Sequence, residues 1–446
     1  MHVKALMICL VVVGMTVSTS IISTTSFIMK EDTFSSGYTG YGYESYSSTG
    51  TASDAYDYGA MTWINAHEAF QHDWSYDVYG ALDDVGIAVI DDGISKEVLG
   101  ELDERGVTFR SYIRVDLSTS KCLRNGVGYT IEYDDQLCDD YSFKYIVDEA
   151  TGPKVDYDGD GTDDHGPKVI PIIPQVAQEV DIWLFDENEN HNDHLGHKLL
   201  RIAAAYKWMI NNRGSHNIKV ISMSIGLPDT APPKDDNAAV DESKLQDEID
   251  YLKTTIGQAR SKFSIFNSAG NTGTYESNTI RDLMIGVTSH NDVDSGTETC
   301  KKKHQRSCSS SYGSHVMFTM PVGSDGVESM EADGDFIKFS GTSAAAPMAA
   351  AAAAVLYAVG KAAGVLFYPS DIFGFLRDTA EQGAIANYMP EPTIGSRTFY
   401  GRNDYVGYGV IDLYDAITAA IAYADFLNLP PPDDGGGSCG KLCWVM

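Results

Sequence analysis

The chain has 446 residues, 43% of them hydrophobic and 21% charged, a globular composition that excludes wholesale disorder. Its 63 acidic residues against 32 basic ones give a net charge of −31, which repels phosphate backbones and argues against nucleic acid as a partner. Such a surface is compatible with bound Ca²⁺ or with high salt, but the charge alone is evidence for neither. This length permits one α/β domain or two to three smaller domains.

The N-terminal segment predicts export. Lys4 precedes an apolar run that ends in small residues near Ser23, which is the order of a secretory signal peptide. The same uncharged stretch is long enough for a marginal membrane anchor, so retention is the alternative. We therefore expect residues 1–23 to be a signal peptide or an N-terminal anchor. The protein would then be secreted, or membrane-anchored with its domain outside the cytoplasm.

Composition divides the rest of the chain into three parts. Residues 24–60 are rich in Ser, Gly and Tyr and cannot bury a core, which predicts a linker or a short pro-segment. Residues 61–429 have a globular composition. Prolines and glycines then predict a flexible tail with a cysteine pair over residues 430–446. The alanine-rich stretch Ala344–Ala363 contains Pro347 and follows a polar turn, so a buried helix is favoured over a membrane span.

Six of the seven cysteines fall into close pairs, and Cys9 lies in the apolar start. An even number clustered in twos predicts three short-loop disulfides in an oxidising compartment. Free buried thiols and a metal site are the alternatives. The pairs are Cys122/Cys138, Cys300/Cys308 and Cys439/Cys443.

Helices and strands alternate along the globular part. The continuous apolar run Val85–Ile90 ends at a polar turn, which predicts a buried parallel strand. Helical periodicity and further apolar runs then follow one another. This alternation predicts an α/β fold with a doubly wound, mostly parallel sheet and helices on both faces. The expected helices are His197–Asn212 and Asp241–Ser261, and the expected strands are Ile218–Ile225, Phe263–Ser268, Ile285–Thr288 and Val316–Met320.

In such a sheet, ligands bind at the carboxyl ends of the strands. Asp91, Ser224-Ile225-Gly226 and Ser268-Ala269-Gly270-Asn271 leave those ends. Acyl transfer needs a hydroxyl, an imidazole to take its proton and a carboxylate to orient the imidazole. It also needs a donor aimed at the developing oxyanion. These groups are available in the segments that contain Asp91, His165, Asn271 and Ser343.

The motifs around these residues resemble those of subtilisin-like serine proteases, in the same order Asp, His, Asn, Ser. The resemblance extends from Met61 to about Leu429. Gly341-Thr342-Ser343-Ala344-Ala345-Ala346-Pro347 resembles the G-T-S-x-A-x-P signature. The other matching segments are Val89–Gly93 for the aspartate motif, His165–Pro171 for the histidine motif, Ser222–Gly226 for a wall of the specificity pocket, and Ala269-Gly270-Asn271 for the oxyanion segment.

The resemblance implies a mechanism. Ser343 would attack a peptide carbonyl, His165 would take the serine proton, and Asp91 would fix the imidazole tautomer. The side-chain amide of Asn271 and the backbone N–H of Ser343 would bind the oxyanion. The specificity pocket would lie between Ser224, Ile225 and Gly226 on one wall and Ala269 and Gly270 on the other. Peptides or proteins would be the substrates, and the chemistry would need no cofactor.

Three positions depart from the family's pattern. Asp92 stands where Ser or Thr is usual, Pro171 replaces a glycine, and Lys168 replaces the second histidine. Proline within a helix costs ~3 kcal/mol or kinks it. Lys168, one turn from His165, is expected to lower the pKa of the imidazole. Reduced activity is compatible with these changes, whereas total loss does not follow from them.

One acidic segment resembles the front half of a Ca²⁺-binding loop. Asp156, Asp158 and Asp160 stand at positions 1, 3 and 5, with Asp164 at position 9. Position 12 is Pro167 instead of the usual Glu. Two interpretations remain: the four aspartates bind a structural Ca²⁺, or the segment is an acidic solvated turn.

The spacing between the Asp and His motifs exceeds that usual in the family. Residues 94–155 contain Cys122 and Cys138 and therefore predict a disulfide-bearing insertion. The function predicted is an exported serine endopeptidase. One alternative is a catalytically silent scaffold of this fold that binds peptides or Ca²⁺. Another is a different serine hydrolase such as an esterase, although Ser343 lacks the G-x-S-x-G context. Cleavage preference and oligomeric state are not predicted.

Overall fold

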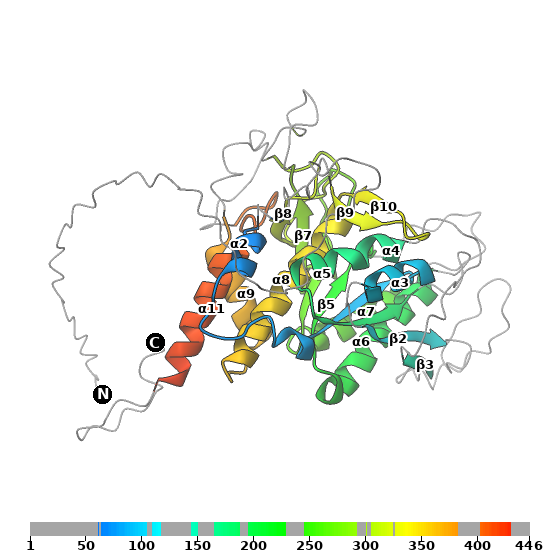
Figure 1. Cartoon of the computed structure of the whole chain (residues 1–446). Coiled ribbons are helices and arrows are strands. Elements are labelled where there is room, and N and C mark those ends of the chain that lie inside the picture. Colours follow the sequence, from blue (N-terminus) through cyan, green and yellow to red (C-terminus); the bar gives the residue numbers. More distant parts are fainter. Residues whose placement is uncertain are drawn as a thin grey trace, which may run out of the picture. The chain divides into compact units, whose positions relative to one another are not determined.

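The structure is a computed structural model that describes residues 61, 64–104, 109–116, 144–149, 165–187, 195–228, 245–291, 300, 305–323, 326–381 and 402–429. Its centre is an eight-stranded sheet with the order β3-β2-β4-β1-β5-β6-β7-β8 (Figure 1). Every pairing is parallel except that of β2 with the edge strand β3. A separate antiparallel hairpin is formed by β9 and β10.

The strands of the sheet are β1 (Gly86–Asp91), β2 (Phe109–Asp116), β3 (Lys144–Glu149), β4 (Asp181–Asp186), β5 (Ile218–Met223), β6 (Ser264–Ser268), β7 (Ile285–Ser289) and β8 (Val316–Met320). The hairpin comprises β9 (Val327–Met330) and β10 (Phe336–Phe339). The helices are α2 (Ala66–Gln71), η1 (Leu82–Asp84), α3 (Lys96–Glu104), α4 (His165–Val169), η3 (Ile170–Ile172), α5 (Ile173–Val176), α6 (Leu195–His216), α7 (Leu245–Ala259), η5 (Arg281–Leu283), α8 (Thr342–Ala362), α9 (Pro369–Thr379) and α11 (Leu413–Asn428).

Two hydrophobic cores lie on opposite faces of the sheet. In β1, Ile87 and Val89 belong to one core and Ala88 and Ile90 to the other, because successive side chains of a strand point to opposite faces. The first core packs under α8, α9 and α11, and the second under α6 and α7. The prediction of a doubly wound α/β fold with helices on both faces is confirmed.

The strand order reverses at β1. β4 pairs with one edge of β1 and β5 with the other, so the chain crosses over its central strand. In doubly wound sheets the crevice for ligands opens at such a reversal, beyond the carboxyl ends of the strands. Asp91, the last residue of β1, therefore lies at the point where this fold places its ligands.

Three strands of the main sheet were not predicted from the sequence. β2, β3 and β4 join the main sheet on one side of β1. The range 94–155, predicted to contain an insertion, thus supplies α3 and two strands of the main architecture. Residues 117–143 between β2 and β3, with Cys122 and Cys138, lie outside the described residues.

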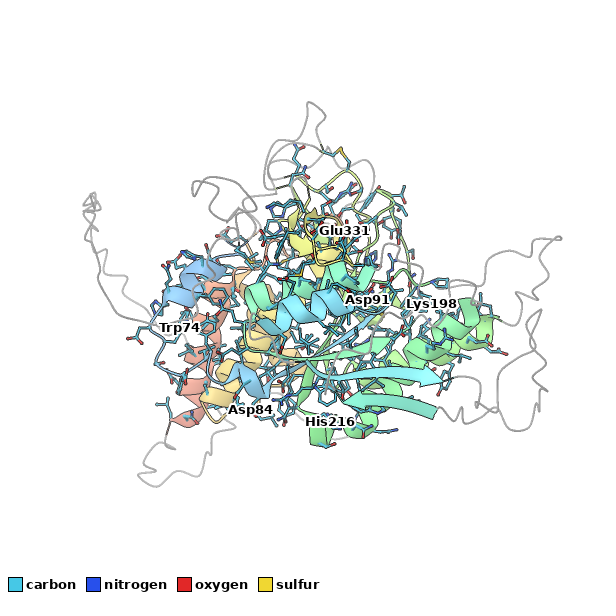
Figure 2. The ribbon with its side chains drawn as sticks, turned by 45° about the vertical axis from the view of Figure 1, so that its right-hand side comes forward. Trp74, Asp84, Asp91, Lys198, His216 and Glu331 are labelled. Atoms are coloured by element: carbon cyan, nitrogen blue, oxygen red, sulfur yellow. A yellow bond between two sulfur atoms is a disulfide. The ribbon has the colours of Figure 1, made fainter. Side chains whose placement is uncertain are left out.

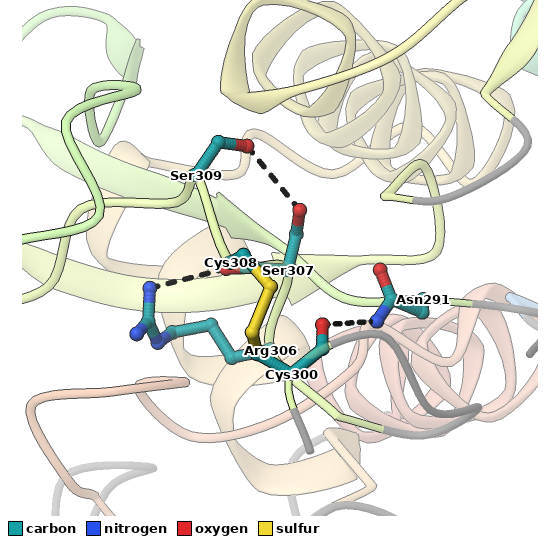
Figure 3. Close-up of a disulfide and its surroundings, with 6 residues drawn as sticks. All are labelled: Asn291, Cys300, Arg306, Ser307, Cys308 and Ser309. Carbon is teal, nitrogen blue, oxygen red and sulfur yellow. Dashed lines mark hydrogen bonds between the residues drawn. A yellow bond between two sulfur atoms is a disulfide. The ribbon is translucent and has the colours of Figure 1, made fainter. Parts of the chain in front are cut away.

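Several other predictions also lie outside the described part of the chain. They concern residues 1–23, 24–60 and 430–446, and with them export, anchoring and the pair Cys439/Cys443. Cys300 and Cys308 are joined by a disulfide (Figure 3). The side-chain amide of Asn291 donates to the carbonyl of Cys300 at 2.7 Å, which ties this short loop to the end of β7. Export stays a prediction.

Helix α8 runs through the centre of the first core, as expected for a buried helix. Nineteen of its residues, Thr342 to Gly360, are buried. Among the described residues it is the one helix long and apolar enough to cross a membrane, and its apolar window is entirely covered by protein. The prediction of a core helix over the alanine-rich stretch is confirmed.

Small side chains let α8 approach the sheet, so we predict that Ala352→Leu is destabilising. Ala352 is fully buried, and the added atoms should lower the free energy of unfolding by about 1–3 kcal/mol through overpacking. The matched control Ala422→Leu, on the exposed face of α11, should change it by less than about 0.5 kcal/mol. Urea unfolding measures both variants, and equal stabilities would contradict the packing described here.

Candidate active site

Asp91 and His165 meet at the carboxyl end of the central strand. Asp91 is 1% exposed, and the His165 side chain, at the first residue of α4, is 33% exposed. Nδ1 of His165 lies 2.8 Å from Oδ1 of Asp91, a hydrogen bond in which the ring N–H donates to the carboxylate. This bond selects the tautomer whose Nε2 can accept a proton. The second carboxylate oxygen of Asp91 has no hydrogen-bond partner among the described residues.

The next residue, Asp92, holds the beginning of α4. Its Oδ2 accepts the backbone N–H of His165 at 3.1 Å, and its Oδ1 accepts that of Gly166 at 2.7 Å. Helix starts leave such N–H groups without intrahelical partners, and a carboxylate there acts as a cap. Sequence reasoning noted Asp92 as unusual but gave it no role. Its contacts span more than seventy residues of chain and could not be read from local pattern.

The three charged groups shift one another's pKa values. Burial would lower the pKa of His165, but the charge and hydrogen bond of Asp91, with the charge of Asp92, raise it to about 9. Burial would raise the pKa of Asp91, but the charge and hydrogen bond of His165 hold it below its ordinary value. Burial and the charge of Asp91 raise the pKa of Asp92 to about 7. The site therefore favours the imidazolium that general-base catalysis generates.

Pro171 is accommodated by a change of helix type. The α-helix that begins at His165 ends at Val169, and the chain continues as the 3₁₀ turn η3. Pro171 stands in the first turn of η3, where the missing N–H leaves no helical bond unmade. Pro174 occupies the same kind of position in α5. The expected strain of a proline inside one continuous helix does not arise.

The charge of Lys168 lowers the pKa of the imidazole, as expected. It is the last of the causes, and the two aspartates outweigh it, so the pKa is raised overall. Its Nζ lies 3.0 Å from Oε2 of Glu331, which partly neutralises it. Figure 2 labels Glu331 and Asp91 in this part of the molecule. Lysine at this position is thus compatible with a basic His165.

The hairpin β9–β10 connects the histidine helix to the serine helix. Ser329 donates from Oγ to the carbonyl of Lys168 at 2.5 Å, and Gln175 donates to the carbonyl of Glu328 at 2.7 Å. The ring of Phe339, the last residue of β10, contacts the His165 ring edge-on at 5.8 Å between centroids. Only three residues then separate Phe339 from Ser343. Sequence reasoning missed this hairpin.

Ser343 is the second residue of α8 and is 8% exposed. Its carbonyl accepts a hydrogen bond from Oγ of Ser224 at 2.9 Å, which ties the start of α8 to the end of β5. Gly341 precedes the helix with φ +93°, a left-handed conformation in which a side chain would be strained. This turn holds Ser343 at the carboxyl edge of the sheet, the edge where β1 ends.

Asn271 is held by the residue before Ser343. Its Oδ1 accepts from the backbone N–H of Thr342 at 3.0 Å and from the Thr342 hydroxyl at 2.9 Å. With the oxygen so occupied, the amide Nδ2–H₂ of the exposed Asn271 is left to donate elsewhere. The assignment of oxygen and nitrogen in this amide follows from the two donors of Thr342.

The predicted walls of the specificity pocket differ in their accessibility. Ser224, Ile225 and Ala269 are buried, whereas Gly226 is exposed and Gly270 is partly exposed. Asn267 bridges the two strand ends by donating to the carbonyls of Met223 and Ile225. Contact with a substrate would therefore come mainly from the backbone of these segments and from the two glycines.

An ion pair between a buried and a partly buried side chain contacts one of these walls. Arg281 and Glu276 form the pair, and Nη1 of Arg281 also donates to the carbonyl of Ala269 at 2.6 Å. Glu276 accepts in addition from the hydroxyls of Thr272 and Ser311. A Cβ at Gly270 would meet the groups of this network at less than 3 Å. Sequence reasoning missed the network, whose members come together only in the folded chain.

Within the described part of the chain, one group of side chains has ligand atoms close enough for a metal ion: Asp91, Asp92 and His165, within 4.8 Å of one another. Nδ1 of His165 and Oδ1 of Asp91 bond to each other, and both oxygens of Asp92 accept backbone N–H groups at the start of α4, so hydrogen bonding within the protein accounts for the cluster. The predicted Ca²⁺ ligands Asp156, Asp158, Asp160 and Asp164 lie outside the described residues. Ca²⁺ binding there stays a prediction.

The model of the subtilase family matches residues 83–409. The chain belongs to the subtilase family. The resemblance seen in the sequence motifs is thereby confirmed. A search of curated proteins finds no matching relative.

Two solved structures are similar to this subtilase. A lanthipeptide protease has 18% sequence identity and a TM-score of 0.49, with 80% of this chain and 95% of that chain covered. The prenylagaramide maturation protease PagA has 15% identity and a TM-score of 0.45, with 77% and 96% covered. At these values the likeness says nothing about the substrates of this subtilase.

The close approach of Gly166 to Gly93 supplies a test of the site. A Cβ at residue 166 would lie 1.8 Å from the carbonyl oxygen of Gly93, so Gly166→Ala must displace α4 from the end of β1. We predict a fall in peptidase activity of about 10²-fold, because small displacements of a catalytic base are costly. The control Gly257→Ala, with no atom within 4 Å of the new Cβ, should retain activity. Equal activities would contradict the tight docking of α4.

Proposed function

We propose that this subtilase is an exported serine endopeptidase that hydrolyses peptide bonds in peptide or protein substrates. Ser343 is the nucleophile, His165 is the general base and acid, and Asp91 orients the imidazole. The amide of Asn271 and the backbone N–H of Ser343 bind the oxyanion. Ser224, Ile225, Gly226, Ala269 and Gly270 line the pocket for the substrate side chain.

The hydrogen bond between Asp91 and His165 is the observation that carries this proposal. A buried carboxylate bound to Nδ1 orients the ring and stabilises its cation, which are the two tasks of the third member of a triad. Its position at the topological reversal of the sheet agrees with the general place of ligands in such folds. The family supplies the expectation that a serine completes the set.

The arrangement around Ser343 supports acyl transfer. The start of α8 offers backbone N–H groups and the positive end of the helix dipole to developing negative charge. Thr342 holds the oxygen of the Asn271 amide, which leaves the amide N–H₂ as the donor. Peptide hydrolysis by these residues needs no cofactor, and Ca²⁺ on the loop of residues 156–164 would be structural.

Hydrolysis of casein compared with short-chain esters tests the proposal. We expect casein to be cleaved by the wild-type protein, with cleavage falling to background in Ser343→Ala. The control Ser215→Ala, on the exposed end of α6, should leave cleavage unchanged. Ester hydrolysis that depends on Ser343 without any cleavage of casein would show an esterase. Peptide binding by a protein that cleaves neither substrate would show a silent scaffold.

The raised pKa of His165 predicts an alkaline enzyme. The base acts as neutral imidazole, so kcat/KM should increase as the pH rises through the pKa of about 9 and fall below it. Lys168→Gln removes a charge that lowers this pKa, and should therefore move the acid limb to higher pH. The exposed Lys361→Gln should not move it. A shift to lower pH in Lys168→Gln would contradict the electrostatic account.

Loss of the Asn271 amide should lower kcat with little change in KM. The oxyanion develops only in the transition state, and removal of one such donor costs about 10²–10³ in kcat in a well-studied member of this family. We predict a decrease of that order for Asn271→Ala with a peptide substrate. The control Asn211→Ala, exposed on α6, should match the wild type. An unchanged kcat in Asn271→Ala would remove this residue from the oxyanion hole.

A further inference from the structure

The two backbone N–H groups that open α4 share one partner. Both oxygens of Asp92 are used, one for His165 and one for Gly166. A serine or threonine hydroxyl at this position has a single oxygen, whereas the carboxylate spans two adjacent N–H groups. Bonds of this kind to an ionised acceptor are stronger than those to a neutral one. Asp92 thus accepts more and stronger hydrogen bonds at the start of α4 than a hydroxyl could.

The short helix has little else to define its first turn. α4 comprises five residues, and a single α-helical turn is not stable by itself. On the side of β1, the carbonyl of Gly93 closes against Gly166, and Gly93 itself has φ +124°. The ring and the backbone of His165 are therefore held by two consecutive residues, Asp91 at the end of β1 and Asp92 directly after it.

We propose that Asp92 is a positioning residue for the general base. Its carboxylate fixes the backbone of His165 and Gly166 and thereby sets where the imidazole lies relative to Asp91 and Ser343. The inference rests on the proposed peptidase function for its kinetic consequence, and on the structure alone for the anchoring of α4. Asp92 acts through His165 and does not touch the substrate in this role.

The ionisation of Asp92 gives this anchoring a pH dependence. Among the described residues, the charged groups that act on it are Asp91 at the end of β1 and His165 on α4. Burial and the charge of Asp91 raise its pKa to about 7. The carboxylate is the stronger acceptor for N–H groups, so the anchor is complete above that pKa and weakened below it. An uncharged amide at residue 92 would be a weak hydrogen-bond acceptor for these N–H groups at every pH.

Three substitutions of Asp92 separate the contributions of its two hydrogen bonds to α4. Asp92→Asn keeps the shape but can accept only one of the two N–H groups, Asp92→Ser restores one acceptor, and Asp92→Ala removes both. We expect kcat with a peptide substrate to decrease about tenfold in Asn and Ser and about 10²-fold in Ala, with KM unchanged. Asp103→Asn, an exposed residue of α3, removes the same charge and should match the wild type.

The pH profile distinguishes positioning from a general loss of structure. Because the charge of Asp92 also raises the pKa of His165, the acid limb of Asp92→Asn should lie at lower pH than that of the wild type, whereas its kcat on the alkaline plateau should be about tenfold lower. A purely structural role would lower activity by the same factor at every pH. Kinetics equal to wild type in Asp92→Ala, or an equal fall in Asp103→Asn, would overturn the proposal.

Amide hydrogen exchange tests the anchoring of α4 without relying on catalytic activity. The amides of His165 and Gly166 should exchange at least about tenfold faster in Asp92→Ala than in the wild type, while those of the core helix α8 stay protected. Unchanged exchange at residues 165 and 166 overturns the anchoring even if the enzyme is active. A wild-type protein that cleaves no peptide but shows faster exchange in the variant would refute the peptidase function and leave the anchoring in place.

Discussion

The hydrogen bond between Asp91 and His165 joins the central strand of the sheet to a helix of five residues, and the rest of the site depends on it. Asp91 is buried at the one point where the strand order reverses. A charge in that place is tolerable only with a partner, because an isolated buried carboxylate would be neutralised or expelled. His165 is that partner, and the need to pair the charge keeps the imidazole at the carboxyl end of the central strand.

The hairpin β9–β10 links the helices that carry His165 and Ser343. Ser329 of the hairpin β9–β10 donates to the carbonyl of Lys168 in α4, and Gln175 of α5 donates to the carbonyl of Glu328 in β9. The chain then leads from β10 into the turn before Ser343. Gly341, in the left-handed conformation, allows the sharp entry into α8. At the far side, Ser224 bonds to the carbonyl of Ser343 and Asn267 bridges β5 and β6. His165, Ser343 and the segments proposed to line the pocket are thus held by contacts between parts of the chain that are distant in the sequence.

Local patterns predicted the elements that carry strong periodicity. β1 and β8 are continuous apolar runs, and α6 has a clear helical repeat, so their positions follow from the sequence within a few residues. β4 was missed because charged aspartates bound its apolar centre and imitate a turn. β2 and β3 were missed because they lie within a range interpreted as an insertion on the basis of motif spacing.

The chemistry of single residues was less predictable than their placement. The pair Asp91–His165 follows from the family's motifs. The two hydrogen bonds from α4 to Asp92, and those from Thr342 to Asn271, require segments distant in the sequence to meet in space. Likewise, Lys168 lowers the pKa of His165 as expected, but the overall shift of that pKa is upward. Glu331, on the hairpin, and Asp92 change the balance, and neither contact is visible along the chain.

Labelling with a fluorophosphonate probe tests most directly whether this arrangement activates a serine. The probe reacts with a hydroxyl only when a base removes its proton, and it does not require a known substrate. We predict that the folded wild-type protein is labelled at Ser343 in mildly alkaline solution, and that Ser343→Ala and His165→Ala are not. A folded wild-type protein that remains unlabelled, with and without Ca²⁺, would contradict the account.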